Sequence, residues 1–291
     1  MIDAFIKQNG LSTRFADLAQ HWYIPLAEQI LMHSHGANTP YFVGINGCQG
    51  SGKTTLTRFL NTYFKEQGQR VATLSLDDFY LSAREREHVA NQQHALFQTR
   101  GVPGTHNWQC IHDVLQSLQA GQEITAPTFN KAQDNPFPVQ HWQHIGSTVD
   151  IVLFEGWCWG VPPQSKEALI EPVNLLERTQ DPDAIWRKRV NTYLQNHYQP
   201  LYTHMNAWLA LIPPSFENVY SWRLQQEHTL RAEYESEHLK APSGIMSDEH
   251  VHHFIQFFQR LTEHAISTMP ERSDWVLYLD EFRNVTHAKG L

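Results

Sequence analysis

A glycine-rich stretch with a lysine and two threonines is the part of this sequence best suited to chemistry. Gly47, Gly52, Lys53 and Thr54 fit the pattern G-x-x-x-x-G-K-S/T, the P-loop, between a short apolar run and an amphipathic helical run. Such a loop points several backbone N–H groups into one concavity, and the N-terminus of the following helix favours anions there. We expect Lys53 to reach the β- and γ-phosphates of a nucleotide and Thr54 to place its hydroxyl on Mg²⁺.

The whole loop is expected to contact the nucleotide, mainly through its backbone. We interpret the Cys48 side chain as a tolerated small group with no role of its own in phosphate binding. A chance match is the alternative, but it requires two glycines, Lys-Thr and a strand–turn–helix context to coincide. The predicted nucleotide-binding residues are Gly47, Cys48, Gln49, Gly50, Ser51, Gly52, Lys53, Thr54 and Thr55.

Acidic side chains follow two further apolar runs that we predict to be strands. Asp77 and Asp78 follow residues 71–76, and Glu155 follows residues 151–154. Ligands bind beyond the carboxyl ends of strands in α/β sheets, so these carboxylates should meet the loop. We expect Glu155 and Asp77 to hold Mg²⁺ with Thr54, and Asp77 also to accept the proton of an acceptor hydroxyl. On an extended backbone the adjacent aspartates would point to opposite sides, and Asp78 could cap a helix; both could instead be ordinary turn residues.

Basic side chains that suit an acidic acceptor or the transferred phosphoryl group lie in two regions. Arg100 and His106 flank a Pro-Gly turn, and a guanidinium fork suits a carboxylate or phosphate. A basic helix farther along is expected to act as a lid within about residues 160–200. Arg187 or Arg189 on it would neutralise charge on the γ-phosphate. For both regions a solvated surface is the alternative, which the sequence leaves open.

Composition narrows the class of protein. The chain has 291 residues, 41% of them hydrophobic and 18% charged, as in an ordinary globular protein. Its net charge of −8 disfavours a general nucleic-acid or anionic-membrane partner. Three scattered cysteines give no disulfide framework and suit a reducing compartment. With no membrane-length apolar run and no signal-peptide pattern at residue 1, we expect a cytoplasmic protein.

Alternating strands and helices predict the architecture. We expect an α/β, P-loop NTPase fold, with a parallel sheet flanked by helices and helical additions, as one domain over residues 1–291. Residues 1–36 should form a helical extension packed outside the nucleotide core, residues 191–238 should be mostly helical, and the end of the chain should be an exposed tail. The clear predicted strands are residues 41–45, 71–76, 149–154 and 275–279.

Three motifs together resemble a known group of enzymes. Residues 47–56, 76–81 and 100–106 are similar to the ATP-dependent D-glycerate 3-kinase family and its uncharacterised kinase relatives. More distantly, Asp77 with Phe79 and Tyr80, and residues 154–156, resemble uridine kinase, phosphoribulokinase and bacterial pantothenate kinase. Residues 222–227, 246–249 and 279–284 also resemble this group, so the resemblance spans about residues 40–285.

The resemblance implies transfer of the ATP γ-phosphoryl group to a hydroxyl of a small molecule. It implies that Asp77 is the base and a metal ligand, that Glu155 helps to hold the metal, and that the 100–106 loop lies at the acceptor. Asn107 and Asn130 depart from the pattern, since an aspartate is expected at each, and both lie on the acceptor side. The predicted acceptor-side residues are Asp78, Tyr80, Arg100, His106 and Lys131.

Two other functions compete with a small-molecule kinase. A GTPase is one, but Gln133 replaces the aspartate of an N-K-x-D guanine signature, and Glu155-Gly stands where D-x-x-G is expected. The other is a regulator or assembly factor that binds ATP without phosphorylating a metabolite, against which intact Asp77 and Glu155 argue. We therefore predict a Mg·ATP-dependent kinase for a small, hydroxylated, acidic acceptor, with D-glycerate the best choice; the sequence predicts no oligomeric state.

Overall fold

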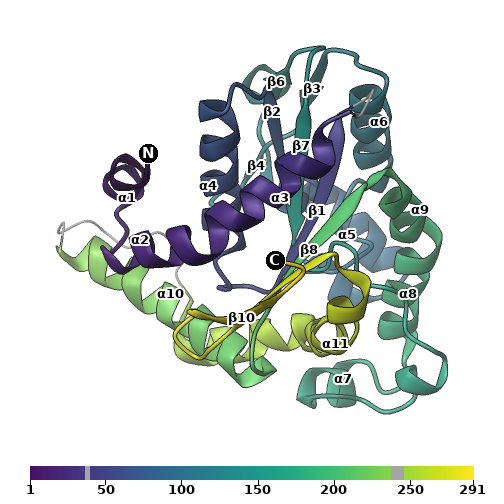
Figure 1. The fold of residues 1–291 in the computed structure, drawn as a ribbon. Coiled ribbons are helices and arrows are strands. Elements are labelled where there is room, and N and C mark those ends of the chain that lie inside the picture. Colours follow the sequence, from purple (N-terminus) through teal and green to yellow (C-terminus); the bar gives the residue numbers. More distant parts are fainter. Residues whose placement is uncertain (37–39, 237–245) are drawn as a thin grey trace.

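A mostly parallel sheet forms the centre of the fold (Figure 1). The computed structural model describes residues 1–36, 40–236 and 246–291. Within these residues six strands form the sheet in the order β10-β9-β8-β1-β7-β2, and all pairings are parallel except β9 with β10. The strands are β1 (Tyr41–Gly47), β2 (Val71–Ser75), β7 (Ile151–Gly156), β8 (Ala207–Ile212), β9 (Trp275–Leu279) and β10 (Val285–Lys289).

The sheet separates two hydrophobic cores because successive side chains of a strand point to opposite faces. Phe42 and Phe154 belong to one core, whereas Val43 and Leu153 belong to the other. Every residue of β1 and β7 is buried, which explains why both strands are nearly continuous apolar runs in the sequence. Burial on both faces leaves only the strand ends free to carry chemistry.

One face of the sheet is covered by the N-terminal helices and by the helix after the P-loop. Phe5 and Phe15 pack their rings against Phe59 of α4, with centroids 5.4 and 5.7 Å away. The predicted packing of residues 1–36 on the nucleotide core is therefore confirmed. The elements on this face are α1 (Ile2–Asn9), α2 (Arg14–Leu18), η1 (Ala19–Tyr23), α3 (Ile24–Ser34), α4 (Lys53–Glu66) and α10 (Phe216–Ser236).

The opposite face carries the remaining long helices. Ser247 caps the longest of these, α11, because its hydroxyl accepts a hydrogen bond from the His250 N–H at 3.3 Å. The elements here are η2 (Leu76–Phe79), η3 (Ala95–Gln98), α6 (Trp108–Gln119), α8 (Ile185–Tyr193), η6 (Leu194–Tyr198), α9 (Gln199–Leu201), η7 (Tyr202–His204) and α11 (Asp248–Arg272). Peripheral elements are α5 (Ala83–Gln92), β3 (Ile124–Ala126), β4 (Phe129–Asn130), β5 (Asn135–Pro136), η4 (Val139–His141), β6 (Gln143–Ile145), η5 (Glu167–Leu169) and α7 (Leu175–Gln180).

Two predictions about the elements are wrong and one is incomplete. In the described part of residues 191–238, residues 191–204 and 216–236 are helical as predicted, but the break between them holds an unpredicted strand, β8, which lies between β1 and β9. A short buried apolar run cannot be told from a helix by its pattern. The end of the chain is not a free tail, since β10 pairs with β9. The second strand ends at Ser75, and residues 76–79 turn into the 3₁₀-helix η2.

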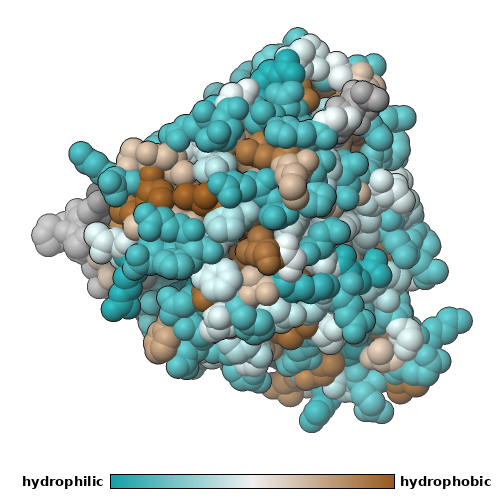
Figure 2. Space-filling view, in the orientation of Figure 1, coloured by the Kyte–Doolittle hydropathy of each residue, from teal (hydrophilic) through white to brown (hydrophobic). Residues whose placement is uncertain are grey.

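The surface in Figure 2 is mostly hydrophilic, with hydrophobic side chains gathered over the N-terminal helices and along the edge where α7 lies. Around α7 the exposed hydrophobic residues are Ile170, Val173, Leu175 and Ile185. Among the helices of the described residues, none is both long and apolar enough to cross a membrane.

Candidate active site

The P-loop joins β1 to α4 as the sequence predicts. Gly50 and Gly52 have φ of 76° and 87°, a backbone conformation that favours glycine, and α4 begins at Lys53. The Ser51 hydroxyl donates to the Cys48 carbonyl at 2.8 Å and closes the turn. Burial raises the pKa of the Cys48 thiol to about 12, so the thiol stays neutral. The loop therefore offers its backbone and Lys53 to a ligand, while the Cys48 side chain remains an uncharged thiol.

A cleft of about 560 Å³ opens beside this loop at the carboxyl end of the sheet, a volume within the usual range for small-molecule sites. It brings together the ends of three strands and two distant helices. The lining residues are Gln49, Gly50, Lys53, Thr54, Ser75, Asp77, Asp78, Tyr80, Arg100, Lys131, Glu155, Arg223, Gln226, Phe254 and Phe258.

Glu155 lies where a nucleotide-borne magnesium ion would be held. Its Oε1 accepts hydrogen bonds from the hydroxyls of Thr54 at 3.1 Å and Ser75 at 3.2 Å. Its Oε2 is buried and has no hydrogen-bond partner among the described residues. An orphaned carboxylate oxygen beside a P-loop hydroxyl fits Mg²⁺, which is commonly held by one or two carboxylates together with substrate phosphates. The part of the chain that the structure describes contains no group of three or more His, Cys, Asp or Glu side chains able to hold a metal, so phosphate oxygens would have to complete the shell.

Lys53 remains charged in this half-buried position. Burial by itself would lower the pKa of Lys53, but the nearby carboxylates of Glu155 and Asp77 outweigh it and raise the pKa. The Lys53 Nζ lies 3.9 Å from Glu155 Oε2. A fixed positive charge therefore faces the cleft beside the loop that would bind the phosphates.

Asp77 and Asp78 both line the cleft, which corrects the prediction that they point to opposite sides. The extended strand stops before them, and the tight turn of η2 brings both side chains to one face. Asp77 accepts from the Tyr80 hydroxyl at 3.0 Å and pairs with Lys131 Nζ at 2.6 Å. Burial would raise the pKa of Asp77, but Lys131 and Lys53 hold it well below its usual range.

Asp78 differs from its neighbour because no cation of the described residues pairs with it. Its Oδ1 accepts a hydrogen bond from the Phe129 N–H at 3.1 Å, so it anchors the short strand β4 and does not cap a helix. Burial raises the pKa of Asp78 to about 6. The two adjacent carboxylates thus have different protonation behaviour, with Asp77 firmly ionised.

Arg100, which the sequence predicts as an acceptor-side residue, lines the cleft. Its guanidinium pairs with Asp134 and lies 5.6 Å from the centre of the Phe129 ring. Asp134 also pairs with the buried Arg86 and has φ of 53°. The loop between β4 and β5 thus supplies a carboxylate to Arg100 and, through Lys131, a cation to Asp77.

His106 does not line the cleft, which corrects its prediction as a direct acceptor ligand. It is buried, stacks on Tyr80 with ring centres 4.4 Å apart, and its Nδ1 lies 2.6 Å from the Tyr198 hydroxyl. Burial lowers the pKa of His106 to about 3. His106 therefore supports the Tyr80 ring from behind as a neutral side chain, and Tyr80 itself faces the cleft.

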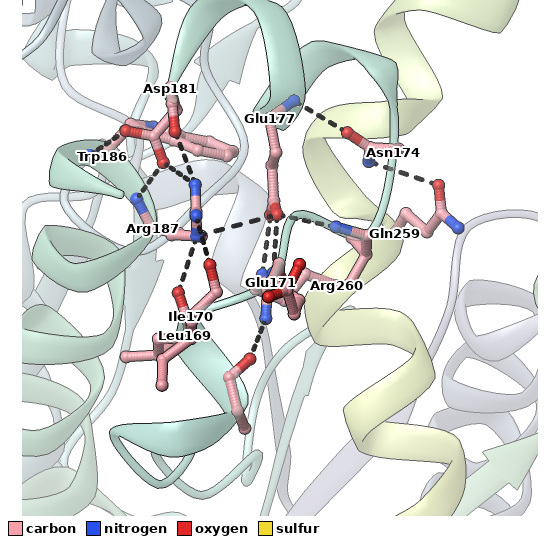
Figure 3. Close-up of polar contacts among 12 residues, drawn as sticks. Leu169, Ile170, Glu171, Asn174, Glu177, Asp181, Trp186, Arg187, Gln259 and Arg260 are labelled. Carbon is pink, nitrogen blue, oxygen red and sulfur yellow. Dashed lines mark hydrogen bonds and ion pairs between the residues drawn. The ribbon is translucent and has the colours of Figure 1, made fainter. Parts of the chain in front are cut away.

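The two predicted lid cations lie elsewhere. The Arg187 guanidinium is buried and bonded to Asp181 and to the carbonyls of Leu169 and Ile170, as Figure 3 shows. An arginine whose charge is paired in the interior cannot also close over a phosphate, so this prediction is wrong for the observed conformation. Arg189 is exposed and lines a separate groove with Gln92 and Tyr193 between α5 and α8.

Besides Ser75 at the end of β2, four cleft residues are not predicted as site residues by the sequence. Arg223 and Gln226 come from α10, and Phe254 and Phe258 come from α11. No motif marks them, because they reach the cleft only through the packing of two late helices. The one available signal is that residues 222–227 resemble the same kinase group. This resemblance marks the segment as common to the group but does not say what its residues do.

Asn107 and Asn130, the two residues that depart from the family pattern, have local structural roles. The Asn107 side chain accepts from the Cys110 N–H at 3.0 Å and caps α6. The Asn130 side chain accepts from the backbone N–H groups of Ala132 and Gln133, at 3.1 and 3.2 Å, and closes the turn that carries Lys131. An aspartate could accept the same bonds, so asparagine preserves both turns without the charge.

Comparisons with known proteins agree with this geometry. Residues 42–164 match the phosphoribulokinase/uridine kinase family. An uncharacterised kinase of Schizosaccharomyces pombe, mug58, is 31% identical over 258 residues, which cover 85% of this chain and 84% of that protein. The chain belongs to the D-glycerate 3-kinase-like family of P-loop kinases.

Relatives with assigned activities are more distant. The chloroplastic D-glycerate 3-kinase of Arabidopsis thaliana is 28% identical to this kinase over 91% of the chain, which spans only 60% of the plant protein. The fold is that of the D-glycerate 3-kinase from Cryptococcus neoformans, with a TM-score of 0.74, 24% identity, and coverage of 92% of this chain and 99% of that one. This kinase is thus an ATP-dependent P-loop kinase.

Proposed function

We propose that this kinase transfers the γ-phosphoryl group of Mg·ATP to a hydroxyl of D-glycerate. The observation that carries the proposal is the shared cleft, which Asp77 and Arg100 line together with Lys53 of the P-loop. An ionised carboxylate beside a phosphate site suits removal of a hydroxyl proton, and a guanidinium suits a small carboxylate. Relatives that are D-glycerate 3-kinases support the choice of acceptor.

The proposed reaction is a direct transfer. The acceptor hydroxyl oxygen attacks the γ-phosphorus, the bond from that phosphorus to the β–γ bridging oxygen breaks, and ADP leaves. Asp77 takes the hydroxyl proton, and the loop backbone with Lys53 stabilises the phosphate oxygens. Thr54, Glu155 and Asp77 would hold the magnesium ion, which supplies charge neutralisation on the phosphates when it is bound.

The ion pair between Lys131 and Asp77 suggests an order of events at the acceptor site. In the observed structure Lys131 Nζ donates a hydrogen bond to one carboxylate oxygen of Asp77. We propose that the carboxylate of the acceptor draws Lys131 toward itself, so that Asp77 becomes accessible to the hydroxyl. Since the side chain of Lys131 is 60% exposed, it has room to move.

The test is ADP release from Mg·ATP across D-glycerate, L-glycerate, pantothenate, uridine and ribulose 5-phosphate. We expect strong stimulation by D-glycerate alone. Stimulation by a different acceptor would refute the substrate and keep the reaction. If every acceptor failed while ATP still bound tightly, the alternative of a nucleotide-dependent regulator would be favoured.

We also propose a cytoplasmic location and no nucleic-acid partner. The location rests on the three cysteines, Cys48, Cys110 and Cys158, which are all free thiols as a reducing compartment would keep them. The proposal that nucleic acid is not a partner rests on the net charge of −8, which disfavours a polyanion. Fractionation of cells that express the tagged full chain would test the location.

A further inference from the structure

Phosphoryl transfer needs a cation near the γ-phosphate besides the P-loop lysine, and the predicted ones do not reach it. Arg187 is paired in the interior, and Arg189 lines another groove. Among the described residues, three cations other than Lys53 line the cleft: Arg100, Lys131 and Arg223. Because charge develops on the transferred group, one of these is expected to face it.

Arg100 and Lys131 are the two cleft cations that the proposed reaction assigns to the acceptor. Arg100 packs over Phe129, and Lys131 lies in the turn between β4 and β5, so both are held by the same peripheral hairpin. Their ion pairs are with Asp134 and Asp77, which lie outside the P-loop. Arg223 differs, since it comes from another element, α10.

The position of α10 is fixed directly on the P-loop. A Cβ atom at Gly50 would lie 2.7 Å from Cβ of Trp222, so the loop and the helix touch at this point. The Arg283 Nε donates to the Gly50 carbonyl at 2.7 Å, and its guanidinium lies 5.2 Å from the centre of the Trp222 ring. Arg223, which follows Trp222 in the chain, therefore lies beside Gln49 and Gly50 of the loop.

The Arg223 side chain is also held in place. It forms an ion pair with Glu227 one turn along α10 and lies 6.0 Å from the centre of the Phe254 ring. Glu227 is buried, and its second oxygen accepts from the Met246 N–H at 3.0 Å, just before α11. A guanidinium has five N–H donors, so one ion pair leaves others for a phosphate.

We propose that Arg223 contacts the γ-phosphate of bound ATP and stabilises the phosphoryl group as it is transferred. The proposal rests on the proposed nucleotide site but not on the identity of the acceptor. It assigns to α10 the role that a lid arginine was expected to fill. Glu227 is then a positioning residue that orients the guanidinium toward the loop.

The difference in affinity between a triphosphate and a diphosphate tests this contact without any acceptor. Calorimetry with Mg²⁺ would give dissociation constants for AMP-PNP, a non-hydrolysable ATP analogue, and for ADP. We expect Arg223→Gln to weaken AMP-PNP binding about 30-fold, the usual size of a lost hydrogen bond to a charged group, and to change ADP binding by no more than about 3-fold. Arg223→Lys should weaken AMP-PNP binding by an intermediate factor, because the charge remains but the fork is lost.

Arg58→Gln is the matched control, since it removes one exposed positive charge from α4. It should leave both dissociation constants unchanged. If Arg223→Gln weakened ADP and AMP-PNP by the same factor, or weakened neither, the γ-phosphate contact would be refuted. Failure of every acceptor in the activity panel would refute the proposed reaction instead, and the two nucleotide affinities would still decide the role of Arg223.

Discussion

Asp77 and Lys131 form an ion pair at the centre of the cleft, and this pair shapes the chemistry available there. The nearby cations keep Asp77 ionised, so it is ready to accept a proton. A carboxylate with a strongly lowered pKa is a weak base, but one close to the reacting hydroxyl gains from proximity. For Asp77 to act as the base, its closeness to the reacting hydroxyl therefore matters more than its pKa.

We predict that Asp77→Asn lowers kcat about 1,000-fold, because the amide cannot accept the hydroxyl proton. The affinity for Mg·ATP should fall far less than kcat, since Lys53, the loop backbone and the other two metal-holding residues, Thr54 and Glu155, remain. Steady-state kinetics with the active acceptor, together with calorimetry for ATP, measures both quantities. Asp113→Asn, a change at an exposed site on α6, is the control. A variant at Asp77 that kept more than a tenth of its turnover would rule out this residue as the base.

The buried His106 predicts a pH dependence of stability. Its pKa in the folded chain is about 3, whereas an unfolded histidine titrates near its ordinary value of about 6.5. The unfolded chain therefore binds the proton more readily, and stability is lost as pH falls from about 6.5 toward 3. Between pH 7 and pH 5 this single group should lower the free energy of unfolding by about 2 kcal/mol.

Urea denaturation of His106→Asn at the two pH values checks this result. The variant should lose less stability than the wild type on acidification, because no imidazole remains to be protonated on unfolding. His88→Asn, at an exposed site on α5, should follow the wild type. Equal pH slopes for all three proteins would contradict the proposed cost of burying a neutral histidine.

At the scale of elements, α11 fixes the loop that carries Arg100. A Cβ atom at Gly101, where φ is 145°, would lie 2.5 Å from the Phe258 ring. The Trp157 indole donates to the Gly101 carbonyl at 3.0 Å, and its ring packs edge-on against Phe258. The loop is thus clamped between β7 and α11, which sets the position of Arg100.

We predict that Gly101→Ala raises KM for the acceptor about 10-fold and leaves KM for ATP nearly unchanged. The added methyl group must displace Phe258 or the loop, and a small displacement of Arg100 is costly for positioning. Gly146→Ala serves as the control, since a Cβ atom there would meet no atom of the described residues within 4 Å. Equal increases in both KM values would point to general damage and contradict the specific role of this loop.

The site divides into parts that the sequence can predict and parts that it cannot. Lys53, Asp77 and Glu155 follow apolar runs at strand ends, so a local pattern locates them and the sheet brings them together. Arg223 and Phe258 carry no such pattern, because their place depends on how two late helices pack. The prediction for Arg187 fails, since a basic helix gives no sign that its arginine is paired in the interior.

The fold divides in a similar way. The strands around the P-loop are flanked by turn residues and lie close to their predicted bounds, whereas β8 lies between helical segments and escapes prediction. The 3₁₀ turn at residues 76–79 depends on contacts with other elements and cannot be seen in an apolar run. The prediction of a single domain over residues 1–291 with a lid at about 160–200 stays a prediction.

At the scale of the whole molecule, a buried cluster of charges ties residues 168–187 to α11 (Figure 3). Arg260 pairs with Glu177 at 2.6 Å and donates to the carbonyls of Ala168 and Glu171. Arg187 pairs with Asp181 close by. Since α11 also carries Phe254 and Phe258, this cluster connects the far edge of the molecule to the wall of the cleft.

We predict that Glu177→Gln lowers the free energy of unfolding by about 3 kcal/mol, because it leaves a buried guanidinium without its carboxylate. The double variant Glu177→Gln with Arg260→Met should lose less than the sum of the two single changes, since no unpaired charge remains at that position. Urea denaturation of the three variants measures the coupling. Arg70→Gln, which breaks an exposed pair with Asp150, should cost less than about 1 kcal/mol. Strictly additive losses at Glu177 and Arg260 would show that the two side chains do not act as a pair, and that other contacts hold this segment on α11.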